Sequence, residues 1–248
     1  MKQPKYTSDL PLYLTHSHPC SYLEGYQART LFVDPRAEID VHRAEWLQQI
    51  GFRRSGGHYY RPACRHCHSC VPVRVPVADF EPNRSQRRNL KRNADLQLIV
   101  RHAQFDYEHY QLYAQYLHAR HSDGDMIEDL SPGSYQRFLL APWGGQTLLM
   151  EWRWHGELVA VAVADCFADG LSAVYTFFSP DHAPRAPGTL AILTQIHEAR
   201  RLGLSYLYLG YWISGSRKMS YKQQFRPLET WDGRVWQRLE RHQSAPSA

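Results

Sequence analysis

The sequence has no apolar run that approaches the ~20 residues of a membrane-spanning helix. Residues 1–7 also lack the apolar stretch of a secretory signal peptide, and five cysteines cannot all pair, so we expect neither secretion nor structural disulfides. The chain of 248 residues has 43% hydrophobic and 21% charged residues, which suits a globular protein with a substantial core. We therefore expect a cytoplasmic protein without a membrane span.

Acidic residues are nearly missing from residues 84–95, where Asp95 alone opposes a dense group of cations. The cations of this segment are Arg84, Arg87, Arg88, Lys91 and Arg92. A helix that starts after Pro82, capped by Asn83 or Ser85, places most of them along one side. An ordinary polar surface helix is the alternative, but it would normally balance Lys and Arg with Glu. Unpaired cations on one face repel each other, so the segment favours a phosphate-bearing polyanion as partner.

A complete local set of four metal ligands is also missing, although a cluster of thiols stands directly before the basic segment. Cys64, Cys67 and Cys70 follow a spacing that metal–thiolate sites use, and Cys20 is the candidate for a distant fourth ligand. This pattern predicts a zinc ion or an iron–sulfur cluster. The alternative is that these cysteines are buried reduced thiols or redox-active ones.

Hydrophobic periodicity divides the chain at a boundary near residue 103. The elements that it predicts are helices at 40–51, 105–121 and 190–202, a hairpin at 52–60, and strands at 96–100, 147–154, 158–167, 171–178 and 205–209. Short polar connections join the three central strands into an antiparallel meander. We expect an α+β fold, with an N-terminal α/β domain carrying the cysteine loop at 1–103 and a C-terminal domain with a mostly antiparallel sheet at 104–248.

The C-terminal order of meander, turn, helix and strand is the order found in GNAT-type acyltransferases. The turn that contains Arg185 and Gly188 leads into a helix whose first backbone amides can hold an anion. The coenzyme A pattern is incomplete, because residue 190 is Leu where that pattern has Gly or Ala. The alternative is that Pro187 and Gly188 only set the entry of the helix.

Five separate motifs resemble one family in the same order along the chain. They are residues 18–23 (HPCSYL), 52–56 (FRRSG), the loop with Cys64, Cys67 and Cys70, residues 84–87 (RSQR), and residues 206–229. Together they resemble the bacterial aspartate/glutamate leucyltransferases, which are relatives of the arginyl-tRNA–protein transferases. The resemblance covers nearly the whole chain. It implies transfer of leucine from leucyl-tRNA to the α-amine of proteins that begin with Asp or Glu, which marks them for degradation as N-degrons.

The chemistry of that reaction requires no cofactor and no covalent nucleophile, because an aminoacyl-tRNA is already an activated ester. In agreement, the hydrolase motif Gly-x-Ser-x-Gly is absent. Lys218 and Lys222, with the basic segment, suit the phosphates of the acceptor stem. Arg61 and Arg74 flank the cysteine loop and are the candidates to bind the acidic side chain of the acceptor, with surface ion pairs as the alternative.

Three residues are candidates for the chemistry itself. Asp165 lies late in an apolar strand, where a carboxylate is costly unless it is paired or used, so we expect it to hold or deprotonate the incoming ammonium. The alternative is that strand alternation points it to solvent. Tyr208 and Tyr211 are candidates to polarise the ester or the ribose hydroxyl, although most of the 16 tyrosines should be packing residues.

Three other functions remain open from the sequence. An arginyl-tRNA–protein transferase would differ in the pocket for the aminoacyl side chain. A coenzyme A-dependent GNAT N-acetyltransferase would bind acetyl-CoA and ignore tRNA. A non-catalytic RNA-binding metal or redox sensor would explain the basic segment and the thiols, but not the acyltransferase-like C-terminal half.

Overall fold

The computed structural model describes residues 10–120 and 125–240. Its strands are β1 (Leu12–Leu14), β2 (His18–Pro19), β3 (Gln27–Ala28), β4 (Thr30–Val33), β5 (Arg53–Ser55), β6 (His58–Pro62), β7 (Val71–Pro76), β8 (Gln97–His102), β9 (Gln146–Trp154), β10 (Glu157–Cys166), β11 (Gly170–Phe178), β12 (Tyr206–Trp212), β13 (Glu229–Trp231) and β14 (Trp236–Arg238). Its helices are α1 (Val41–Gln49), α2 (Arg84–Arg92), α3 (Tyr107–Arg120), α4 (Asp125–Glu128), α5 (Pro132–Leu139) and α6 (Pro187–Arg201), with 3₁₀ helices η1 (Pro180–Arg185) and η2 (Ser220–Gln224).

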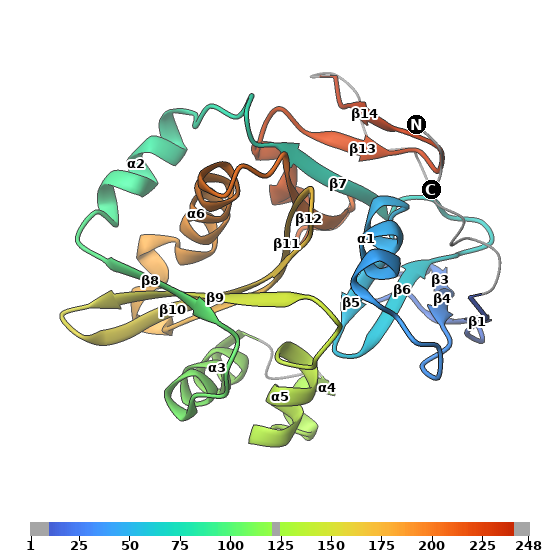
Figure 1. Ribbon diagram of the computed structural model, residues 1–248, viewed down its shortest axis with the longest axis horizontal. Helices are drawn as coiled ribbons and strands as arrows, with labels where there is room; N and C mark the ends of the chain where they lie inside the picture. Colours follow the sequence, from blue (N-terminus) through green and yellow to red (C-terminus); the bar gives the residue numbers. More distant parts are fainter. Residues whose placement is uncertain (1–9, 121–124, 241–248) are drawn as a thin grey trace.

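An eight-stranded sheet in the order β14-β13-β7-β12-β11-β10-β9-β8 forms the centre of the protein (Figure 1). Within this sheet β11 and β12 are parallel, and the other neighbouring strands are antiparallel. The expected meander is β9-β10-β11, and α6 connects it to the parallel strand β12. The predicted α+β class with a mostly antiparallel sheet is thereby confirmed.

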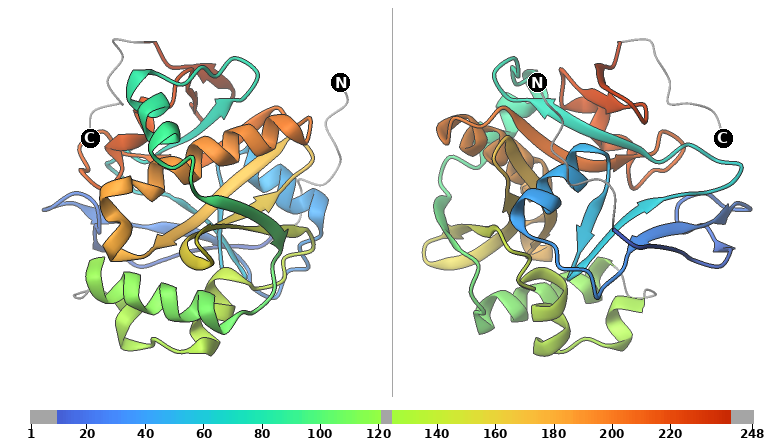
Figure 2. Two further views of the ribbon diagram at one scale, coloured as in Figure 1. Left: turned by 90° about the vertical axis from the view of Figure 1, so that its left-hand side faces the viewer. Right: turned by 45° about the vertical axis from the view of Figure 1, so that its right-hand side comes forward.

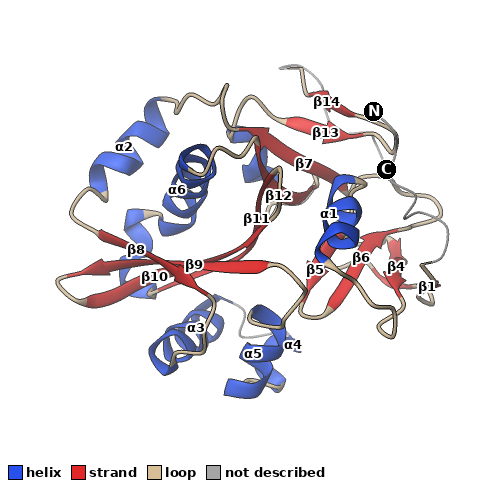
Figure 3. Ribbon diagram, in the orientation of Figure 1, coloured by secondary structure: helices blue, strands red, loops and turns tan. Residues whose placement is uncertain are grey.

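Helices cover both faces of the large sheet (Figure 3). Strand alternation explains this, because Leu148, Met150 and Trp152 of β9 join the core under α6, whereas Leu149 joins the core under α3 and α5. Figure 2 shows α2 lying against α6 at the edge of this layer. In the described part of the chain, no helix combines the length and apolar character needed to cross a membrane.

The N-terminal region adds a four-stranded sheet in the order β1-β4-β6-β5 and the helix α1. Helix α1 begins at the N-cap Asp40, whose carboxylate accepts from the Arg43 amide at 2.8 Å, and is followed by Gly51 at φ +85°. The core of this region also contains Trp143 and Phe167 from later in the chain. The two regions are therefore packed together through shared apolar side chains.

The predicted boundary near residue 103 falls between β8 and α3. Strands β7 and β8 precede it, yet both belong to the large sheet that is formed mainly by later residues. The division into 1–103 and 104–248 stays a prediction about folding units. The predicted helices at 40–51, 84–95, 105–121 and 190–202 are present as α1, α2, α3 and α6, although residue 121 lies outside the described residues.

Candidate active site at a fork between two strands

Strands β11 and β12 separate from each other in the middle of the large sheet. They pair over residues 170–172 and 206–208 only, after which β11 continues beside β10 and β12 continues beside β7. Residues 170–172 are buried, whereas residues 173–176 just past this fork are half-buried. The backbone groups that face each other across the fork need partners other than the opposite strand. The fork is therefore a place where the sheet can accept a polar ligand.

Arg53 of β5 reaches into this fork. Its Nη1 donates to Ser172 Oγ at 2.6 Å, and its Nη2 donates to the carbonyl oxygen of Ala173. Gly210 of β12 passes on the other side at φ +78°, where a Cβ atom would lie 3.1 Å from Nε of Arg53. The register of β12 against β7 also shifts at this point. Only a glycine gives the strand both this conformation and this close approach to the guanidinium.

Lys222 of η2 is a second buried cation whose charge acts on the same region. Its Nζ donates to the carbonyl oxygen of Tyr211, and the residue is 5% exposed. Burial, followed by the charge of Arg53, lowers the pKa of Lys222 to about 7, against an opposing effect of Cys70. Across residues 10–120 and 125–240, no carboxylate lies within ion-pair distance of either Arg53 or Lys222. Arg53 and Lys222 are thus both buried, and neither has a counter-ion among the described residues.

A cavity of about 790 Å³ adjoins this region on the side of the cysteine loop. Its walls include Arg61, Cys64, Cys70 and Tyr211, and the β13–β14 hairpin closes it on the opposite side. The Tyr211 hydroxyl lies 2.8 Å from the carbonyl oxygen of Gly51. Burial raises the pKa of Tyr211 well above its usual value of 10, so its phenol is a fixed hydrogen-bond donor rather than a proton carrier.

The structure separates the two arginines that the sequence suggested for carboxylate binding. Arg61 lines the cavity with its guanidinium 5.0 Å from the centre of the Phe52 ring, and no described carboxylate pairs with it. Arg74 instead donates from Nε to Glu229 at 2.7 Å and stacks 3.5 Å from the Tyr206 ring centre. Arg74 therefore forms an ion pair, but a buried one and not the surface ion pair of the alternative. Arg61 keeps its candidacy as a ligand-binding residue.

Asp165 lies in a buried ion pair. Arg54 donates from Nε and Nη2 to its two oxygens at 2.7 Å each, and the Thr147 hydroxyl donates to Oδ1 at 2.7 Å. Asp165 is 1% exposed, so the expectation that alternation points it to solvent is wrong. Its oxygens are occupied by protein donors and face no described cavity. The geometry thus favours a structural role, and its action as a base stays an untested prediction.

Tyr208 is also held away from the cavity. Its hydroxyl donates to Asp169 at 2.7 Å and accepts from Arg74 at 3.3 Å, and the side chain is buried against Trp236. Burial, followed by the negative charge of Asp169, raises its pKa far above the usual value. Of the three predicted catalytic residues, Tyr211 is the one that lines the cavity.

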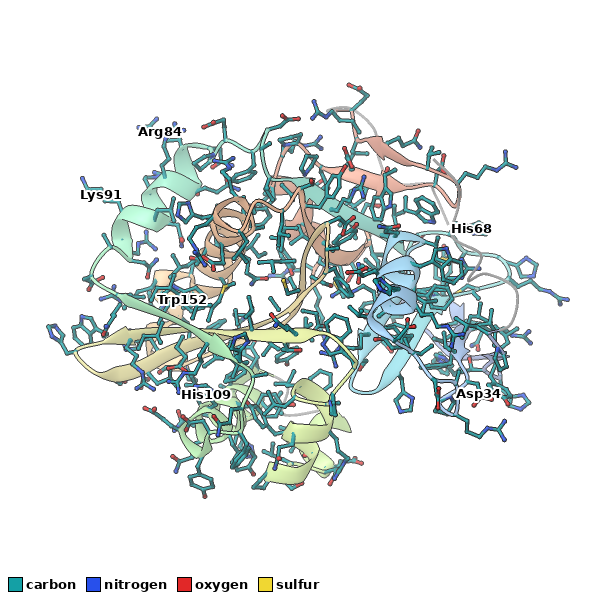
Figure 4. The ribbon with its side chains drawn as sticks, viewed as in Figure 1. Asp34, His68, Arg84, Lys91, His109 and Trp152 are labelled. Atoms are coloured by element: carbon teal, nitrogen blue, oxygen red, sulfur yellow. The ribbon has the colours of Figure 1, made fainter. Side chains whose placement is uncertain are left out.

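The basic segment forms the expected helix α2, with a capping box between Asn83 and Gln86. Its five cations are exposed, none pairs with a described acid, and Figure 4 shows Arg84 and Lys91 pointing away from the body of the protein. The buried face of the helix consists of amides rather than apolar groups. Gln86 donates to the Gln224 carbonyl oxygen, and Asn89 donates to that of Ala186. These bonds fix α2 between η2 and the start of α6.

The two lysines predicted to accompany α2 lie in different surroundings. Lys218 is exposed and free to meet a phosphate. Lys222 is buried beneath η2 and directed at a backbone carbonyl, so it does not present its charge at the surface. Sequence spacing could not show which lysine is exposed and which is buried, because this depends on the fold of residues 213–225.

The cysteines Cys20, Cys64, Cys67 and Cys70 are all free thiols. Cys64, Cys67 and Cys70 line one cavity. Burial, followed by the charges of Cys64, Cys20 and Cys67, raises the pKa of Cys70 to about 12. His68 lines the same cavity. Among the described residues, no three His, Cys, Asp or Glu side chains are arranged to hold one metal ion. Metal binding stays a prediction, which elemental analysis of anaerobically purified protein would test.

Sequence reasoning missed Arg53 and the amide face of α2. Two adjacent arginines in a short hairpin were a usable signal, because strand alternation sends one to each face of the small sheet. An acid within an apolar strand, such as Asp165, also implies a buried cation elsewhere. Nothing in the pattern indicated which arginine would pair with it.

Comparison with known proteins defines the class of this chain. The model "Arginine-tRNA-protein transferase, N terminus" matches residues 18–88, and "Arginine-tRNA-protein transferase, C terminus" matches residues 108–232. The chain therefore belongs to the arginine-tRNA-protein transferase family and is an aminoacyltransferase.

Within that family its relatives carry a more particular name. A protein of Pseudomonas aeruginosa (strain LESB58) named aspartate/glutamate leucyltransferase is 50% identical over 92% of this chain and 96% of that relative. Another from Hahella chejuensis is 50% identical over 89% of this chain and 93% of that relative. The resemblance inferred from the motifs is thereby confirmed. Among solved structures, L-PGS from Bacillus licheniformis aligns with a TM-score of 0.45 and 13% identity, over 68% of this chain and 58% of that one.

Proposed function

We propose that this chain transfers leucine from leucyl-tRNA to the α-amine of proteins that begin with Asp or Glu and so marks them for degradation as N-degrons. The observation that carries the proposal is the 50% identity, over 92% of the chain, to relatives named aspartate/glutamate leucyltransferase. Because the donor is an aminoacyl-tRNA, we propose that the enzyme acts in the cytoplasm.

The geometry of α2 supports a tRNA donor. Five exposed cations without acidic partners form a surface that phosphates can neutralise, and exposed Lys218 lies on the η2 side. The amide bonds from Gln86 and Asn89 connect this helix to η2 and to the start of α6. A tRNA bound to α2 would therefore lie next to η2, which carries Lys222 and lies beside the fork.

The reaction needs alignment more than activation. The α-amine nitrogen attacks the carbonyl carbon of the leucyl ester, a C–N bond forms, the C–O bond to the 3′-terminal ribose breaks, and a proton passes from the amine to the leaving oxygen. We propose that Arg61 and Tyr211 shape the cavity that receives the acceptor, with the Tyr211 ring held in place by the hydrogen bond from its hydroxyl to the Gly51 carbonyl oxygen. No described serine or cysteine is required as a nucleophile.

Transfer of radiolabelled leucine from charged tRNA to peptides that begin with Asp, Glu or Ala tests this function. We expect incorporation into the Asp and Glu peptides and none into the Ala peptide. Incorporation into all three would remove the acceptor assignment, and no incorporation would remove the donor assignment.

A further inference from the structure

Buried arginines in this protein normally have a carboxylate partner. Arg54 pairs with Asp165 and Arg74 pairs with Glu229, each at 2.7 Å. This is the usual arrangement, because a buried cation without a counter-ion loses its hydration and gains little in return. Arg53, which is adjacent to Arg54 in sequence and 9% exposed, departs from this arrangement.

The contacts of Arg53 are all with neutral groups. It donates to a hydroxyl of Ser172 and to a carbonyl oxygen of Ala173, which occupies two of its five N–H groups. On the Nε side, the guanidinium packs against Gly210, where a Cβ atom would lie 3.1 Å from Nε. These contacts therefore hold the guanidinium in place, while its other N–H groups donate to no described residue.

A second uncompensated cation strengthens the local positive potential. Lys222 donates to the Tyr211 carbonyl oxygen and to the Met219 sulfur, the latter at 3.4 Å. The charge of Arg53 disfavours protonation of Lys222, which means that the two groups act on each other through the protein interior. A bound anion beside Arg53 would stabilise its charge and favour the protonated form of Lys222.

We propose that Arg53 is a specificity-determining residue, whose guanidinium receives the side-chain carboxylate of the acceptor's N-terminal Asp or Glu at the fork between β11 and β12. This inference rests on the proposed function, since it names the part of the enzyme that recognises the acidic acceptor. Past the fork, residues 173–176 of β11 are half-buried, in contrast to the buried residues 170–172.

A carboxylate fits this place better than a tRNA phosphate does. Arg53 is nearly inaccessible, whereas the exposed cations of α2 already provide a surface for a strongly hydrated phosphate backbone. A planar guanidinium also matches a carboxylate in a bidentate arrangement, which a lysine would not reproduce. Recognition of Asp and Glu against Asn and Gln requires such a charge.

The experiment compares Arg53→Gln and Arg53→Lys with wild type, using leucyl-tRNA and otherwise identical peptides that begin with Asp or Asn. In Arg53→Gln we expect kcat/KM for the Asp peptide to fall about 10- to 100-fold through KM, because one charged hydrogen-bonded contact is lost. The value for the Asn peptide should stay constant, so the Asp-to-Asn ratio falls equally. Arg53→Lys should restore part of the ratio. Arg137→Gln, the same change in an exposed ion pair with Asp129, should retain wild-type values.

Each alternative predicts a different result. A merely structural role for Arg53 would lower thermal stability or both kcat/KM values together, without changing the ratio, and would overturn the proposal. A phosphate contact would raise KM for leucyl-tRNA and leave the ratio unchanged, with the same consequence. If circular dichroism shows that Arg53→Gln does not fold, the ratio in Arg53→Lys decides.

Calorimetric binding of the Asp and Asn peptides in the absence of tRNA separates this inference from the proposed function. Preferential binding of the Asp peptide that weakens in the variant supports the role of Arg53, even for a protein that transfers no leucine. Equal binding of the two peptides by the wild type refutes it.

Discussion

Replacing Asp165 with Asn should weaken the fold far more than the chemistry. The substitution removes the charge from a carboxylate that accepts three hydrogen bonds of 2.7 Å and leaves Arg54 as a buried cation without a partner. Breaking one side of a buried ion pair typically costs about 3–5 kcal/mol. For a chain of this size, that loss corresponds to a decrease in melting temperature of roughly 10 °C.

The assay measures both quantities on the same protein. Urea denaturation gives the free energy of unfolding, and leucine transfer at a temperature where the variant is fully folded gives the rate. We expect the transfer rate of Asp165→Asn to stay within a few-fold of wild type. The matched control is Arg54→Met combined with Asp165→Leu, which replaces the pair with apolar groups and should recover most of the lost stability.

The opposite result would refute this reasoning. General-base catalysis contributes about 10²- to 10⁴-fold to a rate. If Asp165→Asn retained wild-type stability but lost that much activity, and the apolar double variant were equally inactive, Asp165 would be the base and the structural interpretation of the ion pair would be wrong.

Three further predictions concern the basic helix, the buried lysine and the fork. Replacing all three of Arg84, Arg88 and Lys91 by Gln should reduce the slope of log affinity for tRNA against log salt concentration by about 2 to 3, because about 0.7–0.9 counter-ion is released per phosphate contact. An unchanged slope in a filter-binding assay would show that α2 is not part of the tRNA interface. Burial lowers the pKa of Lys222 from 10.5 to about 7. Above pH 7 the unfolded chain therefore binds more protons than the folded chain, and the free energy of unfolding rises by about 1.4 kcal/mol per pH unit. Urea denaturation from pH 7 to 9 should show that increase in wild type relative to Lys222→Met, and parallel curves would contradict the lowered pKa. Gly210→Ala should cost at least about 1–2 kcal/mol in the same assay, since alanine is strained at φ +78°; a neutral effect would contradict the close packing at the fork.

Local signals in the sequence predicted the elements well because each signal acts over a few residues. The meander β9-β10-β11 followed from apolar strands separated by short polar turns, and α1 followed from an apolar period that ends at Gly51. The fork could not be predicted in the same way. It depends on where β11 stops pairing with β12, and the strand β7 on the other edge of β12 comes from about 130 residues earlier in the chain.

Only part of the candidate site was predicted from the sequence, because local signals were visible there and long-range contacts were not. The cations of α2 were identified because they lie close together in sequence and the helix period aligns them on one side. Arg53 and Lys222 were not identified as buried basic residues, because the burial of side chains on β5 and η2 depends on contacts across the whole fold. The amide face of α2 was missed because only apolar residues were expected to dock a helix, whereas Asn89 and Gln86 use backbone carbonyls as partners.

The most direct test of the account is to incubate the purified chain with a mixture of all aminoacyl-tRNAs, acetyl-CoA and a peptide that begins with Asp, and to sequence the product by mass spectrometry. The account predicts a peptide extended by a single leucine on its α-amine, and no extension of the matching Ala peptide. Extension by arginine, acetylation of the amine, or an unchanged peptide would contradict it.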